Sequence, residues 1–221
     1  MTSRVSEVPG LRDRLHVFRD RAHAGEILAG MLEDYRSSQT LIMAIPAGGI
    51  PVAAVLARKL LLPLDVAVVS KITLPWNTEA GYGAVAFDGT TRLNRDLLPR
   101  LRLSEEEIEA GKAATVKKVE RRVDRFRGSR PYPDLIKEKV ILVDDGLASG
   151  FTLLVGVEAL KKSGAGDHRC CSDGKLKRRS ACGSGSGQPA LRQHPGRLEL
   201  CRCRCLRTLD RCGRGRSPSD L

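Results

Sequence analysis

Aromatic residues and long apolar runs are scarce in this chain of 221 residues. No stretch approaches the roughly 18 apolar residues that span a bilayer, so we expect no membrane partner. Charged residues near the start, among them Arg4 and Glu7, interrupt any apolar leader, which predicts a cytoplasmic location. Aromatics make up only 4% of the residues, so aliphatic side chains must supply the core.

Cysteine is absent from residues 1–166, and all seven cysteines lie between Cys170 and Cys212. An odd number without an export signal argues against a disulfide framework. Zinc sites favour paired ligands such as C-x2-C, whereas Cys201, Cys203 and Cys205 alternate with arginine. We interpret these cysteines as an accident of composition.

Valine, isoleucine, phenylalanine, tyrosine, tryptophan and methionine are all absent from residues 167–221. Such a segment lacks the residues that build a strand core, so the sheet is expected to end at the strand near Val140. Arginine, glycine, serine and cysteine dominate instead, as they do when a GC-rich coding region is read out of frame. We predict two parts, an incomplete α/β domain at 1–166 and a basic, low-complexity tail of frameshifted origin at 167–221.

The formal net charge of +12 raises nucleic acid as a partner. However, the tail alone holds 13 Lys or Arg against 5 Asp or Glu, and it lacks aromatic residues for stacking on bases. The charge therefore argues only weakly for a nucleic-acid partner.

Alternating helical and strand patterns indicate the fold class. Asp20 is a plausible N-cap for a first helix, and a short apolar strand at 41–45 is followed by a helix from Pro51 to about Leu61. Further strands are expected at 64–70 and 139–143, with a β-hairpin excursion at 81–94 and a long helix opened by the capping box of Ser104 and Glu107. The pattern predicts an α/β fold with a parallel twisted sheet, helices on both faces and an irregular C-terminal tail.

The segment from Val140 to Thr152 is the most informative in the chain. Four apolar residues deliver Asp144 and Asp145 to the carboxyl end of a strand, where ligands bind in open α/β sheets. Small residues then let main-chain N–H groups face a phosphate at the start of a helix. The loop residues are Gly146, Leu147, Ala148, Ser149, Gly150 and Thr152. Because carboxylates repel phosphate, Asp144 and Asp145 suit ribose hydroxyls, and the pattern predicts a ribose 5-phosphate site.

This segment resembles the signature of the type I phosphoribosyltransferases: four apolar residues, two acids and a small-residue phosphate loop. The resemblance implies that Asp144 and Asp145 hold the ribose hydroxyls of phosphoribosyl pyrophosphate, while the loop from Gly146 to Gly150, with Thr152, holds its 5′-phosphate. It also implies the fold of that family.

Two further segments fit the same resemblance. Ala47, Gly48 and Gly49 lie where the family binds pyrophosphate, and Lys71 opens a segment, 71–94, that matches the mobile substrate loop. Lys71 is a candidate to meet the departing pyrophosphate, although a solvated strand-end lysine fits the sequence equally well. A second set of residues is similar to a branch of predicted phosphoribosyltransferases in which position 47 is often arginine; the set is Phe18, Asp20, Arg21, Ala24, Gly25, Leu28, Ala29, Asn77, Glu79, Gly81 and Gly83.

The resemblance implies a glycosyltransferase that moves phosphoribose to a nitrogen acceptor, usually a nucleobase, with release of pyrophosphate. Mg²⁺ is the expected cofactor, held mainly through the substrate, with Asp144 and Asp145 as further candidate ligands. Relatives often form homodimers. Two alternatives remain open: an RNA-binding regulator on the same fold, and a catalytically silent homologue.

Overall fold

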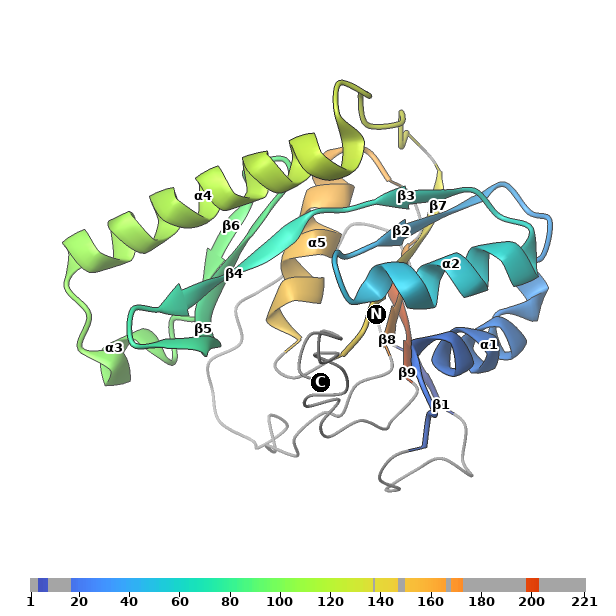
Figure 1. The fold of residues 1–221 in the computed structure, drawn as a ribbon, viewed down its shortest axis with the longest axis horizontal. Helices are drawn as coiled ribbons and strands as arrows, with labels where there is room; N and C mark the ends of the chain where they lie inside the picture. The colour runs from blue at the N-terminus through green and yellow to red at the C-terminus, as the bar shows by residue number, and fades with distance from the viewer. Residues whose placement is uncertain are drawn as a thin grey trace, which may run out of the picture.

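The computed structural model describes residues 17–136, 138–146 and 150–165, together with the backbone of three short strands at 4–7, 168–172 and 198–202. Two sheets organise this part of the chain. One has six parallel strands in the order β1-β9-β8-β7-β2-β3, and the other has three antiparallel strands in the order β4-β5-β6 (Figure 1). The fold is α/β, as predicted.

The centre of the parallel sheet is formed by β2 (Thr40–Ala44) and β7 (Lys139–Asp144), which pair from Thr40 with Lys139 to Ala44 with Val143. Their side chains alternate between two cores. Ile42 and Val143 pack against α1 (Arg21–Met31) and α2 (Gly49–Leu60), whereas Met43 and Leu142 pack against α5 (Phe151–Lys162). The sheet is thus covered by helices on both faces, which explains the unbroken apolar runs of both strands.

Helix boundaries follow the predicted signals closely. Asp20 is the N-cap of α1 and accepts a hydrogen bond from the His23 N–H at 2.7 Å. Ser104 and Glu107 form the expected capping box of α4 (Glu105–Arg127). Helix α5 begins at Phe151, so Thr152 lies in its first turn. Two shorter helices complete the described set, the 3-10 helix η2 (Glu33–Tyr35) and α3 (Leu98–Leu101).

The single strand predicted at 64–70 is wrong, because the chain there divides between the two sheets. β3 (Leu64–Val66) pairs in parallel with β2, whereas β4 (Val69–Leu74) pairs antiparallel with β5 (Asn77–Ala86). The residues between them, Ala67 and Val68, are fully buried where the chain passes from one sheet to the other. The apolar run is continuous because both strands and their junction lie in the interior.

The predicted hairpin excursion is confirmed and is larger than expected. β5 and β6 (Thr91–Leu93) join β4 in a separate sheet that α4 covers on one face and α5 meets on the other (Figure 1). Ile72, Tyr82 and Val119 share the core under α4. We call this sheet with α4 the wing.

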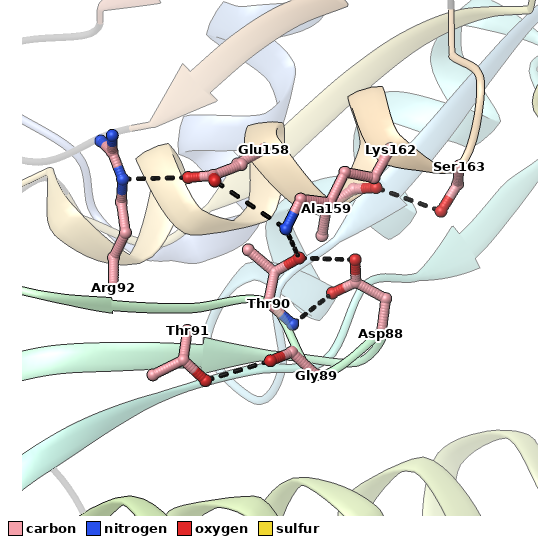
Figure 2. Close-up of polar contacts among 9 residues, drawn as sticks. All are labelled: Asp88, Gly89, Thr90, Thr91, Arg92, Glu158, Ala159, Lys162 and Ser163. Atoms are coloured by element: carbon pink, nitrogen blue, oxygen red, sulfur yellow. Dashed lines mark hydrogen bonds and ion pairs between the residues drawn. The ribbon is translucent and has the colours of Figure 1, made fainter.

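Polar contacts tie the wing to α5 (Figure 2). Glu158 of α5 lies 3.0 Å from the Arg92 Nε of β6 and 3.9 Å from the Lys162 Nζ. Lys162 also donates a hydrogen bond of 3.0 Å to Thr90, whose side chain and N–H both bond to Asp88 in the β5–β6 turn. The helix that follows the predicted phosphate loop is therefore fastened to the wing.

The expectation that the sheet ends at the Val140 strand is wrong. β8 (His168–Ser172) pairs in parallel with β7, and β9 (Leu198–Arg202) lies between β8 and β1 (Arg4–Glu7). Parallel pairing uses main-chain groups, so a segment without β-branched residues can still extend the sheet. The division of the chain at residue 166 and the frameshifted origin of the tail stay predictions. No helix among the described residues has the length and apolar character that crossing a membrane requires.

Candidate functional site

The end of β7 places two carboxylates at the carboxyl edge of the parallel sheet. Asp144 is the last residue of the strand, and its side chain is almost completely buried. Burial, and next the adjacent charge of Asp145, raise the pKa of Asp144 to about 7. The Asp145 N–H donates a hydrogen bond of 2.8 Å to Asp144 Oδ1, which partly offsets this rise. Asp144 can thus hold or release a proton near neutral pH.

Asp145 is half-buried and turns toward the neighbouring strand. β2 leads into the loop of Pro46, Ala47 and Gly48, and α2 begins at Gly49. The Ile45 N–H donates to the Val143 carbonyl at 2.8 Å, which holds the start of this loop beside the end of β7. A Cβ added at Gly48 would overlap the Asp145 carboxylate, and one at Gly49 would lie 2.7 Å from the Val143 oxygen. Only glycine allows this approach.

The structure therefore brings together two of the predicted segments, the doubled acid and the loop of Ala47 to Gly49. The peptide bond between Pro46 and Ala47 is cis. Ala47 is exposed, and Gly48 and Gly49 are packed against the end of β7. The main-chain N–H of Gly49 donates to the Ile45 oxygen at 3.0 Å, as in the first turn of a helix.

The predicted phosphate loop is described only at its ends. Gly146 follows Asp145, and Gly150 precedes α5 with a φ of 73°, a left-handed conformation that favours glycine. Thr152 is half-buried in the first turn of α5, which carries no acidic residue. Leu147, Ala148 and Ser149 lie outside the described residues. Main-chain N–H groups and the dipole at the start of a helix attract anions, so the start of α5 stays a candidate for binding one.

Lys71 lies on β4 and its side chain is engaged within the wing. Its ammonium group donates a hydrogen bond of 3.1 Å to the Glu79 carbonyl across the β4–β5 pair. Lys71 also lowers the pKa of Asp144, as the smallest of several influences. The Lys71 ammonium therefore acts on Asp144 electrostatically, while its hydrogen bond is to the β4–β5 hairpin.

Arg21 contacts the candidate site, although the sequence did not reveal this contact. It is the first residue of α1, and its Nη2 lies 2.8 Å from Asp145 Oδ2. The two residues are separated by 124 positions in the chain. The only sequence signal was the place of Arg21 within the F-x-D-R pattern from Phe18, which carries no information about this partner.

The donor set around the acids suits a hard cation only in part. Asp144 and Asp145 offer carboxylate oxygens, which Mg²⁺ prefers. Within the described part of the chain, no group of three or more His, Cys, Asp and Glu side chains could hold a metal ion. A magnesium ion here would have to take most of its ligands from a bound substrate and from water.

Comparison with known proteins identifies a family. Residues 19–172 match the phosphoribosyl transferase domain family. Two proteins named as phosphoribosyl transferases, from two strains of Mycobacterium tuberculosis, are each 33% identical to this chain over 151 residues. The alignment covers 68% of this chain but 34% of each relative, so the chain spans about a third of their length.

A solved structure shares the fold. The crystal structure of a protein from Thermus thermophilus is similar over 89% of this chain and 87% of its own, with a TM-score of 0.61 and 26% sequence identity. The family match begins just before α1 and ends with β8, so it includes Arg21, both acids and the loop after β2.

Proposed function

Because the chain belongs to the phosphoribosyl transferase domain family, a family of transferase enzymes of the glycosyltransferase type, we propose that it binds phosphoribosyl pyrophosphate and transfers its phosphoribosyl group to a nitrogen acceptor. Pyrophosphate is the leaving group. The bond between the anomeric carbon and the pyrophosphate oxygen breaks, a bond from that carbon to nitrogen forms, and the nitrogen loses its proton.

One observation carries this proposal: the Asp144–Asp145 pair lies against the Gly48–Gly49 turn at one edge of the sheet. A polyanion alone would be repelled by two carboxylates, whereas a sugar with vicinal hydroxyls can donate hydrogen bonds to them. The glycine turn beside them suits the anionic group on the same sugar. A ligand that is both sugar and anion satisfies both features.

The residues of the chain have separate tasks in this scheme. Asp144 and Asp145 accept from the ribose hydroxyls and fix the ring. The start of α5, with Gly150 and Thr152, faces the 5′-phosphate, and Ala47, Gly48 and Gly49 face the pyrophosphate. The reaction passes through an oxocarbenium-like state, so position and charge matter more than a covalent nucleophile.

Asp144 and Asp145 are the residues that would contact Mg²⁺ brought in with the substrate. The ion would neutralise charge on the departing pyrophosphate. Lys71 is a second source of positive charge, provided that its ammonium leaves the Glu79 carbonyl. We propose a nucleobase as the acceptor class, and hence a role in nucleotide metabolism, because ring nitrogens are the acceptors that the family resemblance implies.

Calorimetry with the full chain tests the proposal. Phosphoribosyl pyrophosphate is titrated with MgCl₂ into the wild type and into the double variant Asp144→Asn with Asp145→Asn. Loss of two hydrogen bonds to charged groups should weaken binding by about a hundredfold or more. A matched variant, Glu120→Gln with Asp124→Asn, removes two exposed acids from α4 and should bind like the wild type.

Equal affinity of the wild type and the double variant for the sugar ligand would reject the assigned roles. Release of pyrophosphate with a panel of nucleobases tests transfer separately. Tight binding without release for any base would identify a catalytically silent homologue, the alternative that sequence left open.

A further inference from the structure

Arg21 occupies the edge of the loop that faces pyrophosphate in the proposed function. Its Nη2 lies 2.8 Å from Asp145 Oδ2, and the same oxygen is the atom nearest to a Cβ built on Gly48. Asp145 Oδ2 therefore contacts the Arg21 guanidinium and occupies the space that a side chain at Gly48 would need. Three segments from distant parts of the chain meet at this oxygen.

Stability does not account for this ion pair. The Arg21 and Asp145 side chains keep 39% and 34% of their surface exposed. Ion pairs at such exposure add little to folding, because solvent screens them and two long side chains lose freedom. We explain the contact by its position, because it holds the delocalised positive charge of Arg21 at the edge of the sheet.

The guanidinium has hydrogen-bonding capacity to spare. Arginine carries five N–H donors, and Arg21 uses Nη2 to donate to Asp145. Its Nε–H is buried and has no acceptor among the described residues. Two oxygens of a phosphate group match the fork of a guanidinium, which a single carboxylate oxygen does not fill.

Under the proposed function, a positively charged group such as the Arg21 guanidinium is needed to offset the two acids beside the loop. Two carboxylates, Asp144 and Asp145, face a site that must accept a highly charged anion, and Ala47 brings no charge of its own. Lys71 already donates to the Glu79 carbonyl in the wing. Of the described cations, Arg21 is in direct contact with the acids.

We propose that Arg21 is a substrate-contacting residue that binds the pyrophosphate group. This inference rests on the proposed function and adds a residue to it. In the free chain Arg21 shields the Asp145 charge. When the ligand binds, its remaining N–H donors take pyrophosphate oxygens next to Gly48 and Gly49, while Asp145 accepts from the sugar.

Two separate ligands distinguish this role from simple positioning of Asp145. Calorimetry measures Mg²⁺–pyrophosphate and ribose 5-phosphate binding to the wild type, Arg21→Gln and Arg36→Gln. Arg21→Gln should weaken pyrophosphate binding about tenfold to a hundredfold, the range for lost hydrogen bonds to a charged group, and leave ribose 5-phosphate binding within about threefold. Arg36 is the matched control, because it forms an exposed ion pair with Glu33 away from the acids.

A double-mutant cycle with Asp145→Asn provides the second measurement. If Arg21 contacts pyrophosphate, Arg21→Gln still weakens pyrophosphate binding in the Asp145→Asn background. Should Arg21→Gln fail to fold, Arg21→Lys keeps the charge without the fork and is expected to weaken pyrophosphate binding about threefold to tenfold.

Three results would overturn the proposal: unchanged pyrophosphate affinity in Arg21→Gln, an equal loss for both ligands, or no effect of Arg21→Gln in the Asp145→Asn background. A wild type that binds ribose 5-phosphate but not pyrophosphate would also overturn it, and would leave the sugar site standing. Failure of the wild type to bind ribose 5-phosphate would instead count against the proposed function.

Discussion

The carboxylate of Asp145 lies against the α-carbon of Gly48, in space that any side chain at position 48 would occupy. The two residues belong to loops that follow adjacent strands, β7 and β2. Sequence gives each loop separately, but only the pairing of the strands makes one depend on the other.

We expect Gly48→Ala to impair ligand binding much more than folding. The new methyl group would displace a flexible, half-exposed carboxylate, so the free energy of unfolding should change by less than about 1 kcal/mol. Affinity for phosphoribosyl pyrophosphate should fall about tenfold or more, because Asp145 can no longer lie where it meets Arg21. Calorimetry and urea unfolding measure the two effects.

Gly30→Ala is the matched control for that change. A Cβ at Gly30 meets nothing within 4 Å, and the residue lies inside α1. Alanine should stabilise the helix by as much as about 1 kcal/mol and leave binding unchanged. Normal ligand affinity in Gly48→Ala would show that the contact with Asp145 has no part in the site.

Asp144 should make the protein less stable as the pH rises from about 4 to 7. Its pKa is about 7 in the folded chain and near 3.8 when unfolded, so the folded state binds more protons across this range. The shift corresponds to roughly 4 kcal/mol, which is the upper bound on the stability that Asp144→Asn recovers at pH 8. Denaturant unfolding of both proteins at pH 4 and pH 8 measures it. Parallel pH profiles would contradict the assignment.

A side chain at Gly111 should lower the free energy of unfolding, because Tyr82 fills the space beside this residue. A Cβ at Gly111 would overlap the Tyr82 hydroxyl, and Tyr82 is buried under α4. Gly111→Ala should destabilise the fold by about 1–3 kcal/mol despite the better helix propensity of alanine. Thermal unfolding of Gly111→Ala with and without Tyr82→Phe checks this. Removing the hydroxyl should restore most of the loss, and no recovery would place the cost elsewhere.

The ion pair of buried Arg127 with partly buried Asp65 should be costly to break by removing one partner. Arg127 is almost fully buried, stacks 3.8 Å above the Tyr132 ring and donates to the Pro131 carbonyl at 2.6 Å. Arg127→Leu leaves the Asp65 carboxylate without this partner and should cost about 3–5 kcal/mol.

The double variant Arg127→Leu with Asp65→Leu isolates the unpaired charge at this junction. It should be more stable than Arg127→Leu alone, because no carboxylate is left without its partner. Guanidinium unfolding compares the two. A double variant that is as unstable as the single one would assign the loss to packing against Tyr132 instead.

The sequence predicted the helix starts and the strand that depend on residues close together in the chain. The N-cap at Asp20, the capping box at Ser104 and the apolar run before Asp144 each gave an element within a residue or two of its place. The doubled acid and the glycines after β2 predicted a candidate site, because short apolar strands followed by acids or glycines are typical of sheet edges that bind ligands. The structure brings these two segments together, and ligand binding there stays a prediction.

What the sequence did not show depends on tertiary partners. Nothing in Arg21 indicates that it pairs with a carboxylate 124 positions away. The run at 64–70 is apolar throughout, so its pattern could not reveal that the chain changes sheets between Val66 and Val69. The strands β8 and β9 were missed because side-chain preferences cannot predict a pairing that main-chain groups alone can make.

The adjacency of β2 and β7 has a consequence for how the protein matures. These strands are about a hundred positions apart in the chain, so the loop closure that unites them is slow relative to helix formation. In a nascent chain that has formed α1 and α2 but not β7, Asp144 and Asp145 do not yet lie beside the Gly48 turn. Under the proposed function, retention on an immobilised sugar phosphate should therefore select only molecules in which β2 and β7 have paired, so the same experiment would measure folding as well as ligand binding.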